Sequence, residues 1–265
     1  LAVDVRGGAP GTFGAYPFAR AVCFAGGSLY GLEAATGVAA ELLARGGYRT
    51  DWETIATVAG AIISDWSVRD NAIYPDKALG RAALRAARPG AFPLGPRGAG
   101  RSATVGKALG PAFREPAGQG GAWRRLGATR LAVFTVVNAV GAIVDRQGRV
   151  VRGHRDPATG ERHHFADYLE RSFAQRAVPE PPAGNTTVSL VVTNQVVPPL
   201  LLQQIGRQVH SSMARALQPF HAPTDGDVLF TVSTGAVENP DLDPRALAGF
   251  ASELAWDAIL TCFDP

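Results

Sequence analysis

The junction Gly184-Asn185-Thr186-Thr187 has the residue types and the setting that most suggest chemistry. A polar stretch ending in PEPPAG, typical of a linker, leads directly into TTVSLVVTN, whose β-branched alternation predicts a strand. If the chain is cut before Thr186, the new α-amine lies beside the threonine hydroxyl and can serve as its base. That amine has an ordinary pKa of about 8, so it accepts a proton at neutral pH. Without a cut, the same residues are a plain junction between linker and strand, and the local sequence leaves both interpretations open.

Lysine is rare in this chain, which makes each lysine a candidate for chemistry. Only Lys77 and Lys107 are lysine among the 26 basic residues, and the others are arginine. Together with 31 Gly and 19 Pro, this indicates a GC-rich coding bias that turns replaceable lysine into arginine. Arginine is always charged, whereas a buried lysine can lose its proton and take part in proton transfer. Composition alone does not distinguish the two lysines.

Other common catalytic and binding patterns are missing from the sequence. The glycines of GAPGTFGAY precede no helix suited to a dinucleotide, and neither a Walker Lys-Ser/Thr pair nor a G-x-S-x-G elbow occurs. The pair His163-His164 has no metal-ligand spacing, and His210 and His221 show no arrangement with Ser and Asp. Cys23 and Cys262 form no disulfide framework, and we interpret them as core residues. We therefore expect no metal and no organic cofactor.

Composition and charge exclude several classes of protein. Apolar residues make up 46% and charged residues 18% of the 265 residues, which excludes global disorder. The net charge is +3 and the arginines are scattered, without a basic stripe interleaved with aromatics, so we expect no nucleic-acid partner. No apolar run is long enough to span a bilayer, and the first residues lack a secretory signal. We therefore expect a cytoplasmic protein without a membrane partner.

The elements that must position these residues alternate between strands and helices. Strand signals lie at 1–5, 18–27, 57–66, 186–194 and 225–235. Helices are expected at 28–47, 76–88, 164–176, 198–217 and 244–260. The apolar run 130–145 predicts a long strand or a strand pair covered on both faces, whereas 89–121 should be mostly loop with a short strand in SATVGKAL. This alternation indicates a layered α/β protein.

Several long strings resemble one known family. The strings GNTTVSLVVTN and RQVHSSMARALQPFHAPTDGDVLFTVSTG closely resemble the small subunit of the 6-aminohexanoate-oligomer endo-hydrolases, or nylon hydrolases. These enzymes belong to the P1-type family of N-terminal-nucleophile aminopeptidases and amidases. Further matches are DVRGGAPGT (4–12), SVRDNAIYPDKALGRAALRAARPGAFPLGPRGAGRSATVGK (67–107) and LAVFTVVNAVGAIVD (131–145). The resemblance therefore covers nearly the whole chain in the expected order.

The resemblance implies a fold and a maturation step. The fold is a four-layer αββα-type N-terminal-nucleophile hydrolase-like fold, of the aminopeptidase and ornithine acetyltransferase type. Residues 1–265 are expected to form one catalytic domain, which cuts itself between Asn185 and Thr186 into a large subunit, 1–185, and a small subunit, 186–265. The family also implies a homo-oligomer, a tetramer of such αβ units.

The resemblance also assigns roles at the reaction centre. It implies that Thr186 is the nucleophile both in self-cleavage and in turnover. Lys107, in SATVGK, matches the active-site lysine of the family, and Asn138, in FTVVNAVG, matches the asparagine that donates to the developing oxyanion. A preorganised donor of this kind contributes about 3–4 kcal/mol to acyl-transfer transition states.

Three further residues receive an implied role with a plain alternative. Asp225 and Asp227, in TDGDVLF, match acidic residues that position the threonine and its amine, although a DGD triplet is also a common turn. Tyr74, in NAIYPDK, matches a pocket tyrosine that binds substrate, although a tyrosine beside a proline can simply pack. Lys77 is expected at a helix start in a structural role or at a subunit contact.

The implied activity is hydrolysis of 6-aminohexanoate oligomers, of the nylon-6 type, through an acyl-enzyme. One alternative is a P1-family aminopeptidase that releases N-terminal β- or D-amino acids from peptides. Another is an acyltransferase like the ornithine acetyltransferases, which share the fold and the threonine nucleophile. A member that never matures and only binds or supports other molecules is the alternative outside enzymology. The expected partner is in each catalytic case a small amide or peptide substrate.

Overall fold

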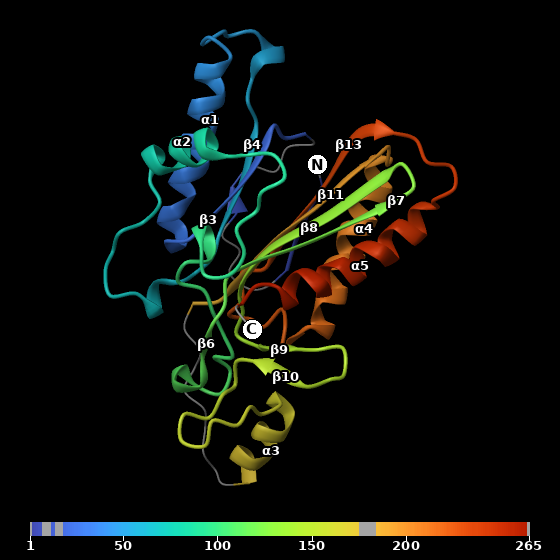
Figure 1. The fold of residues 1–265 in the computed structure, drawn as a ribbon. Helices are drawn as coiled ribbons and strands as arrows, with labels where there is room; N and C mark the ends of the chain where they lie inside the picture. The colour runs from blue at the N-terminus through green and yellow to red at the C-terminus, as the bar shows by residue number, and fades with distance from the viewer. Residues whose placement is uncertain (1, 7–11, 14–17, 175–183, 264–265) are drawn as a thin grey trace.

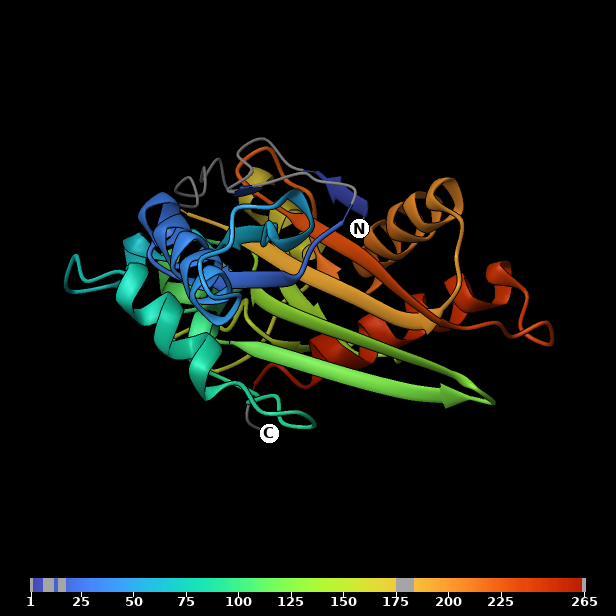
Figure 2. The same cartoon turned by 90° about the horizontal axis from the view of Figure 1, so that it is seen from above.

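The computed structural model describes residues 2–6, 12–13, 18–174 and 184–263, and the predicted linker before Gly184 lies outside this part of the chain. The described residues form four layers, in the order helices, small sheet, large sheet, helices (Figures 1 and 2). This arrangement confirms the expected αββα architecture. The helices are α1 (Glu33–Arg45), α2 (Lys77–Ala86), α3 (Phe165–Ala174), α4 (Pro199–Ser212) and α5 (Pro244–Leu260). None of the helices described is long and apolar enough to cross a membrane.

The large sheet has the strand order β1-β13-β11-β8-β7, and a small sheet with the order β2-β4-β3 packs on one of its faces. A third sheet, β10-β9-β12, lies with α3 at one end of the layers (Figure 1). The strands are β1 (Ala2–Val5), β2 (Thr12–Phe13), β3 (Ala21–Ala25), β4 (Val58–Ile62), β5 (Thr104–Val105), β6 (Glu115–Pro116), β7 (Gln119–Leu126), β8 (Thr129–Asn138), β9 (Ala142–Val144), β10 (Val150–Arg152), β11 (Thr186–Gln195), β12 (Leu217–Gln218) and β13 (Val228–Val237). Strand β11 lies between β8, to which it is antiparallel, and β13, to which it is parallel.

The large sheet is buried on both faces, because successive side chains of a strand point to opposite sides. On one face, Val133 of β8 and Leu229 of β13 pack in the core that also contains α4 and α5. On the other face, Val136 and Phe230 pack against Ala61 of β4. Burial on both sides explains why these strands are nearly continuous apolar runs.

Most elements predicted from the sequence are present, the strand pair at 130–145 among them, and one expectation needs correction. The run 130–145 is a strand pair that splits between sheets, since β8 belongs to the large sheet and β9 to the β10-β9-β12 sheet. The predicted loop at 89–121 ends earlier than expected, because residues 119–121 already belong to strand β7, on which Trp123 is exposed. This strand forms through pairing with β8 along its whole length, from Gln119 opposite Val136 to Leu126 opposite Thr129. The partner strand β8 follows directly after the turn at 127–128, but the sequence of β7, which lies at the edge of the sheet, shows no apolar alternation that would predict a strand.

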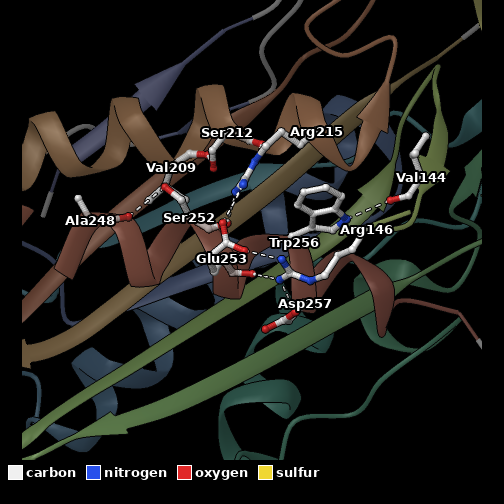
Figure 3. Close-up of polar contacts among 10 residues, drawn as sticks. All are labelled: Val144, Arg146, Val209, Ser212, Arg215, Ala248, Ser252, Glu253, Trp256 and Asp257. Atoms are coloured by element: carbon white, nitrogen blue, oxygen red, sulfur yellow. Dashed lines mark hydrogen bonds and ion pairs between the residues drawn. The ribbon is translucent and has the colours of Figure 1, made fainter. Parts of the chain in front are cut away.

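A polar network around Trp256 joins helix α5 to the end of strand β9 (Figure 3). The indole Nε1 of Trp256 donates to the Val144 carbonyl at the end of β9 (3.0 Å). The guanidinium groups of Arg146 and Arg215 lie 4.9 and 4.8 Å from the ring centroids of Trp256, and Arg215 pairs with Glu253 at 2.7 Å. Exposed ion pairs contribute little one by one. Here the hydrogen bond and both guanidinium contacts meet at the same side chain, Trp256, and together they fix the orientation of α5.

A substitution at Gly120 of β7 tests the close packing of α5 on the large sheet. A Cβ at Gly120 would lie 1.9 Å from the Ala258 carbonyl oxygen of α5. We expect Gly120→Ala to displace the helix and to lower the free energy of unfolding by about 1–3 kcal/mol. Gly249→Ala on the open side of α5 is the control, because no atom lies within 4 Å of its Cβ. The higher helix propensity of alanine should make the Gly249→Ala variant more stable by about 1 kcal/mol. Chemical denaturation measures the free energy of unfolding of both variants, and an equal change in the two would contradict the close contact at Gly120.

Candidate active site

Thr186 is the first residue of β11 and is buried at the end of the large sheet. Its hydroxyl accepts a hydrogen bond from the backbone N–H of Ser64 (3.3 Å) and donates to the carbonyl oxygen of Asn185. The antiparallel pairing of β11 with β8 places Thr186 opposite Asn138. The hydroxyl therefore lies against the peptide bond that is the expected cleavage point.

Lys107 follows β5 in a tight turn and is only 3% exposed. The turn requires Gly106, whose φ is +80° and whose added Cβ would lie 2.1 Å from the backbone nitrogen of His154. The Nζ of Lys107 donates to the carbonyl oxygen (3.1 Å) and the side-chain oxygen (3.0 Å) of Asn138. It also donates to the carbonyl oxygen of Gly184 at 3.3 Å. The amine thus ties the end of β8 to the residues just before β11.

The environment of Lys107 changes its acid–base behaviour. Burial is the main reason that the pKa of Lys107 falls from 10.5 to about 7, and the nearby charge of Asp225 acts in the opposite direction. An amine with this pKa can exchange a proton near neutral pH. Lys77, in contrast, is the exposed first residue of α2. Burial therefore separates the two lysines that composition left equivalent.

The side-chain amide of Asn138 is fully buried, and both of its ends are hydrogen-bonded. Its oxygen accepts from Lys107 and from the backbone N–H of Thr104 (3.0 Å). Its Nδ2 donates to the carbonyl oxygens of Ser64 (2.7 Å) and Gly184 (3.5 Å). In the intact chain the amide thus binds two backbone carbonyls, and donation to an oxyanion stays a prediction.

Asp225 and Asp227 are both fully buried in the segment before β13. Asp225 accepts hydrogen bonds from the backbone N–H groups of Val140 (3.3 Å) and Ala222 (3.1 Å). Burial, and then the negative charge of Asp227, raise the pKa of the Asp225 carboxyl above its usual range. Asp227 accepts from the backbone N–H of Thr187 at 2.7 Å. The second carboxylate therefore fixes the backbone of β11 one residue after the candidate nucleophile.

Sequence reasoning missed contributions from the backbone and from a histidine. The N–H of Gly226 donates to the Asn185 carbonyl oxygen at 3.1 Å, so a donor already faces the expected cleavage point. A backbone donor, like the N–H of Ser64 at the threonine hydroxyl, carries no signature in residue type. His221 lies with its Nδ1 2.9 Å from Asp227 Oδ2, across a turn that the sequence pattern did not resolve.

Tyr74 lies apart from this cluster. Its ring centroid is 5.7 Å from that of Tyr30, and a hydrogen bond with Glu33 raises the pKa of the Tyr74 hydroxyl. Tyr74 and Asp65 line a cavity of about 230 Å³. Asp65 directly follows Ser64, whose backbone N–H binds the Thr186 hydroxyl, so a residue that lines the cavity is the chain neighbour of a residue in the cluster. Contact between Tyr74 and a substrate stays a prediction.

The candidate site can also be checked for metal ligands. Among the residues that the structure describes, no group of three His, Cys, Asp or Glu side chains is arranged to hold a metal ion.

The family model described as Peptidase family S58 matches residues 2–263. The chain belongs to peptidase family S58. This S58 peptidase is a hydrolase that acts on amide bonds, as the sequence resemblance implied.

One curated relative and two solved structures are similar to this S58 peptidase. It is 48% identical to the 6-aminohexanoate-oligomer endohydrolase of Agromyces sp. (strain KY5R), over 98% of this chain and 76% of that protein. A Burkholderia sp. beta-aminopeptidase shares the fold with a TM-score of 0.66 and 17% identity, covering 98% of this chain and 72% of that one. The L-aminopeptidase D-Ala-esterase/amidase of Ochrobactrum anthropi, described as a new variant of the Ntn hydrolase fold, gives a TM-score of 0.59 and 16% identity over 88% of this chain and 62% of that one. These likenesses confirm the resemblance to the nylon hydrolases and the predicted fold class.

The burial of Lys107 predicts a pH-dependent effect on stability. Between pH 7 and 10.5 the unfolded chain holds the lysine proton and the native chain does not, so stability rises with pH by up to about 1.4 kcal/mol per unit. Lys107→Met removes this dependence. Both proteins carry Thr186→Ala, so that the expected cleavage after Asn185 does not interfere with the measurement. The stability of the Met variant relative to the protein with Lys107 should therefore fall as the pH rises through this window.

Lys77→Met is the matched control for this measurement. Lys77 is exposed at the start of α2, and the stability difference caused by its replacement should stay the same across this pH range. Denaturant titrations at four or five pH values give both series. Parallel lines for the Lys107 and Lys77 variants would contradict a buried amine that loses its proton near neutrality.

Proposed function

We propose that this protein cuts its own chain between Asn185 and Thr186 and then hydrolyses amide bonds with Thr186 as an N-terminal nucleophile. The observation that carries the proposal is the position of the Thr186 hydroxyl, which is buried and in contact with the carbonyl of the residue before it. The site-residue assignments and the division into 1–185 and 186–265 are part of this proposal.

The geometry supports a sequence of bond changes for self-cleavage. The Oγ1 of Thr186 gives up its proton and attacks the carbonyl carbon of Asn185. The carbonyl oxygen gains the negative charge, and the Gly226 N–H at 3.1 Å is placed to stabilise it. The C–N bond then breaks, the threonine nitrogen takes up a proton, and an ester joins Asn185 to Thr186. Water hydrolyses this ester, which leaves a carboxylate on Asn185 and a free α-amine on Thr186.

Cleavage also frees hydrogen-bond donors for a substrate. In the intact chain the Gly184 carbonyl accepts from both Lys107 Nζ and Asn138 Nδ2. When the new C-terminus leaves, these two buried donors lose that acceptor, and an amide carbonyl of a substrate can take its place. The free α-amine of Thr186 then serves as base, Asn138 stabilises the oxyanion, and Lys107, with a pKa near 7, exchanges protons.

We assign 6-aminohexanoate oligomers as the substrate class. Support comes from the 48% identity to an endohydrolase named for these oligomers, over 98% of this chain. Tyr74 and the cavity that it lines with Asp65 are the proposed binding region beside the nucleophile. A homotetramer of αβ units is the proposed assembly.

Replacing the nucleophile tests the central proposal. Thr186→Ala removes the only hydroxyl placed against the Asn185 carbonyl among the described residues, so the chain should stay in one piece. Hydrolysis of a linear 6-aminohexanoate trimer should fall by at least about a thousandfold, as expected for loss of a covalent nucleophile. Intact mass spectrometry and chromatography of released 6-aminohexanoate measure the two effects.

Thr187→Val is the matched control for this replacement. Thr187 is the next residue, equally buried, and its hydroxyl has no hydrogen-bond partner in the described structure. Valine keeps its shape and its backbone N–H, so cleavage and turnover should persist within a few-fold. Cleavage after Asn185 in the Thr186→Ala variant, or equal loss in both variants, would remove Thr186 from its assigned role. Release of single N-terminal residues from β-peptides in place of internal oligomer cleavage would instead favour an aminopeptidase.

Lys107→Arg tests whether a permanent positive charge can replace the buried amine of Lys107. Arginine keeps a positive charge but does not deprotonate near neutral pH, and its larger head group does not fit the three oxygens that hold Nζ. We expect the turnover rate to fall by about a hundredfold or more, in the range typical of lost acid–base catalysis. Steady-state rates on the trimer, compared with Lys77→Arg as control, give the answer, and unchanged turnover would show that proton exchange by Lys107 is not needed.

A further inference from the structure

A string of polar side chains runs from the surface to the site and ends at Asp227. The Nδ1 of His221 lies 2.9 Å from Asp227 Oδ2, and the ring of His221 meets the ring of His210 edge to face at 4.5 Å. The Nδ1 of His210 lies 3.1 Å from Asp4 Oδ2, which also accepts from Arg6 Nε at 2.7 Å. Strand β1, helix α4 and the segment before β13 each contribute to this string.

His221 occupies the place in this string that touches the candidate site. A carboxylate offers only acceptor oxygens, so in this contact the Nδ1 of His221 is the atom that carries the hydrogen. The other oxygen of Asp227 accepts from the Thr187 N–H at 2.7 Å. Each oxygen of this fully buried carboxylate thus has one partner, and His221 is the only side chain among the described residues that supplies one.

We propose that His221 is a positioning residue, whose Nδ1–H holds the Asp227 carboxylate so that its other oxygen fixes the backbone after Thr186. The role rests on the proposed function and adds a residue to it. Without His221, Asp227 Oδ2 is a buried lone pair without a donor, which is costly for a charged group. The carboxylate then rotates toward another donor, which loosens the hydrogen bond to the Thr187 N–H and changes the position of the Thr186 hydroxyl.

A purely structural role for His221 is the competing explanation. The ring of His221 also packs on Phe220, with centroids 3.9 Å apart, and on His210. Its Nε2 is buried without a partner in the described structure, so the ring is not held by hydrogen bonds at both ends. If packing were its whole contribution, any substitution that removes the ring should have the same effect, whether or not the new side chain can donate a hydrogen bond.

The backbone at His221 allows substitutions that separate these explanations. Its φ is +58°, a left-handed conformation that Gly, Asn and Asp accept more readily than other residues. His221→Gly removes the side chain without adding backbone strain. His221→Asn places an amide nitrogen on the same branch as Nδ1 and can still donate to Asp227. His221→Asp has nearly the same shape as the Asn variant but cannot donate when ionised.

The experiment follows cleavage of the full-length precursor and hydrolysis of the 6-aminohexanoate trimer in the wild-type chain and the three variants. We expect the Gly and Asp variants to cleave about ten- to a hundredfold more slowly, as for loss of one hydrogen bond to a charged group. The Asn variant should recover cleavage to within about threefold of the wild type. Thermal unfolding in a Thr186→Ala background shows whether each variant is folded; if His221→Gly is not, the Asn and Asp pair still decides.

Each outcome supports or overturns a definite statement. Wild-type rates in the Gly and Asp variants would overturn the role of His221 while leaving the proposed function intact. Equal slowing in the Asn and Asp variants would also overturn it, because the ability to donate would then make no difference. A wild-type chain that stays intact and does not hydrolyse the trimer would overturn the proposed function itself, and the role of His221 with it.

Discussion

The buried amine of Lys107 is the interaction on which the geometry of the site depends. Its Nζ binds oxygens of Asn138 and Gly184, so one group joins the turn after β5, the end of β8 and the segment entering β11. Such an amine is tolerated in the interior because burial lowers its pKa to about 7 and because carbonyl oxygens satisfy its donors. With a pKa near 7, the same amine can exchange a proton at neutral pH, which is the property that the proposed role requires.

The large sheet supplies the rigidity that this interaction requires. Strand β11 is central, and its pairing with β8 sets Thr186 opposite Asn138 while its pairing with β13 brings the two aspartates alongside. Apolar layers on both faces of the sheet fix the register, because a slip by one residue would turn every buried side chain to the wrong face. The candidate nucleophile is therefore held by a strand end within a packed core, and its position does not depend on a surface loop.

Several separate groups stabilise the two carboxyl groups beside the candidate nucleophile. Asp225 is bound by backbone N–H groups, and burial beside Asp227 raises its pKa. Asp227 is bound by the Thr187 N–H and by His221, which connects through His210 to Asp4 and Arg6 near the surface. Two carboxylates so close together need such partners, since a buried charge without them is destabilising.

The sequence alone determined the order of most strands and helices, the rarity of lysine and, through resemblance, the family. Periodicity and residue type carry these features, because they record which side chains are buried. Only the tertiary structure decided that β8 and β9 enter different sheets, that β7 pairs along a polar edge, and that Lys107 is the buried lysine. It also supplied the N–H groups of Ser64 and Gly226 and the contact of His221 with Asp227. Backbone donors look alike in every sequence, and long-range pairing brings together residues whose spacing along the chain has no fixed period, so no reading of residue types could have found them.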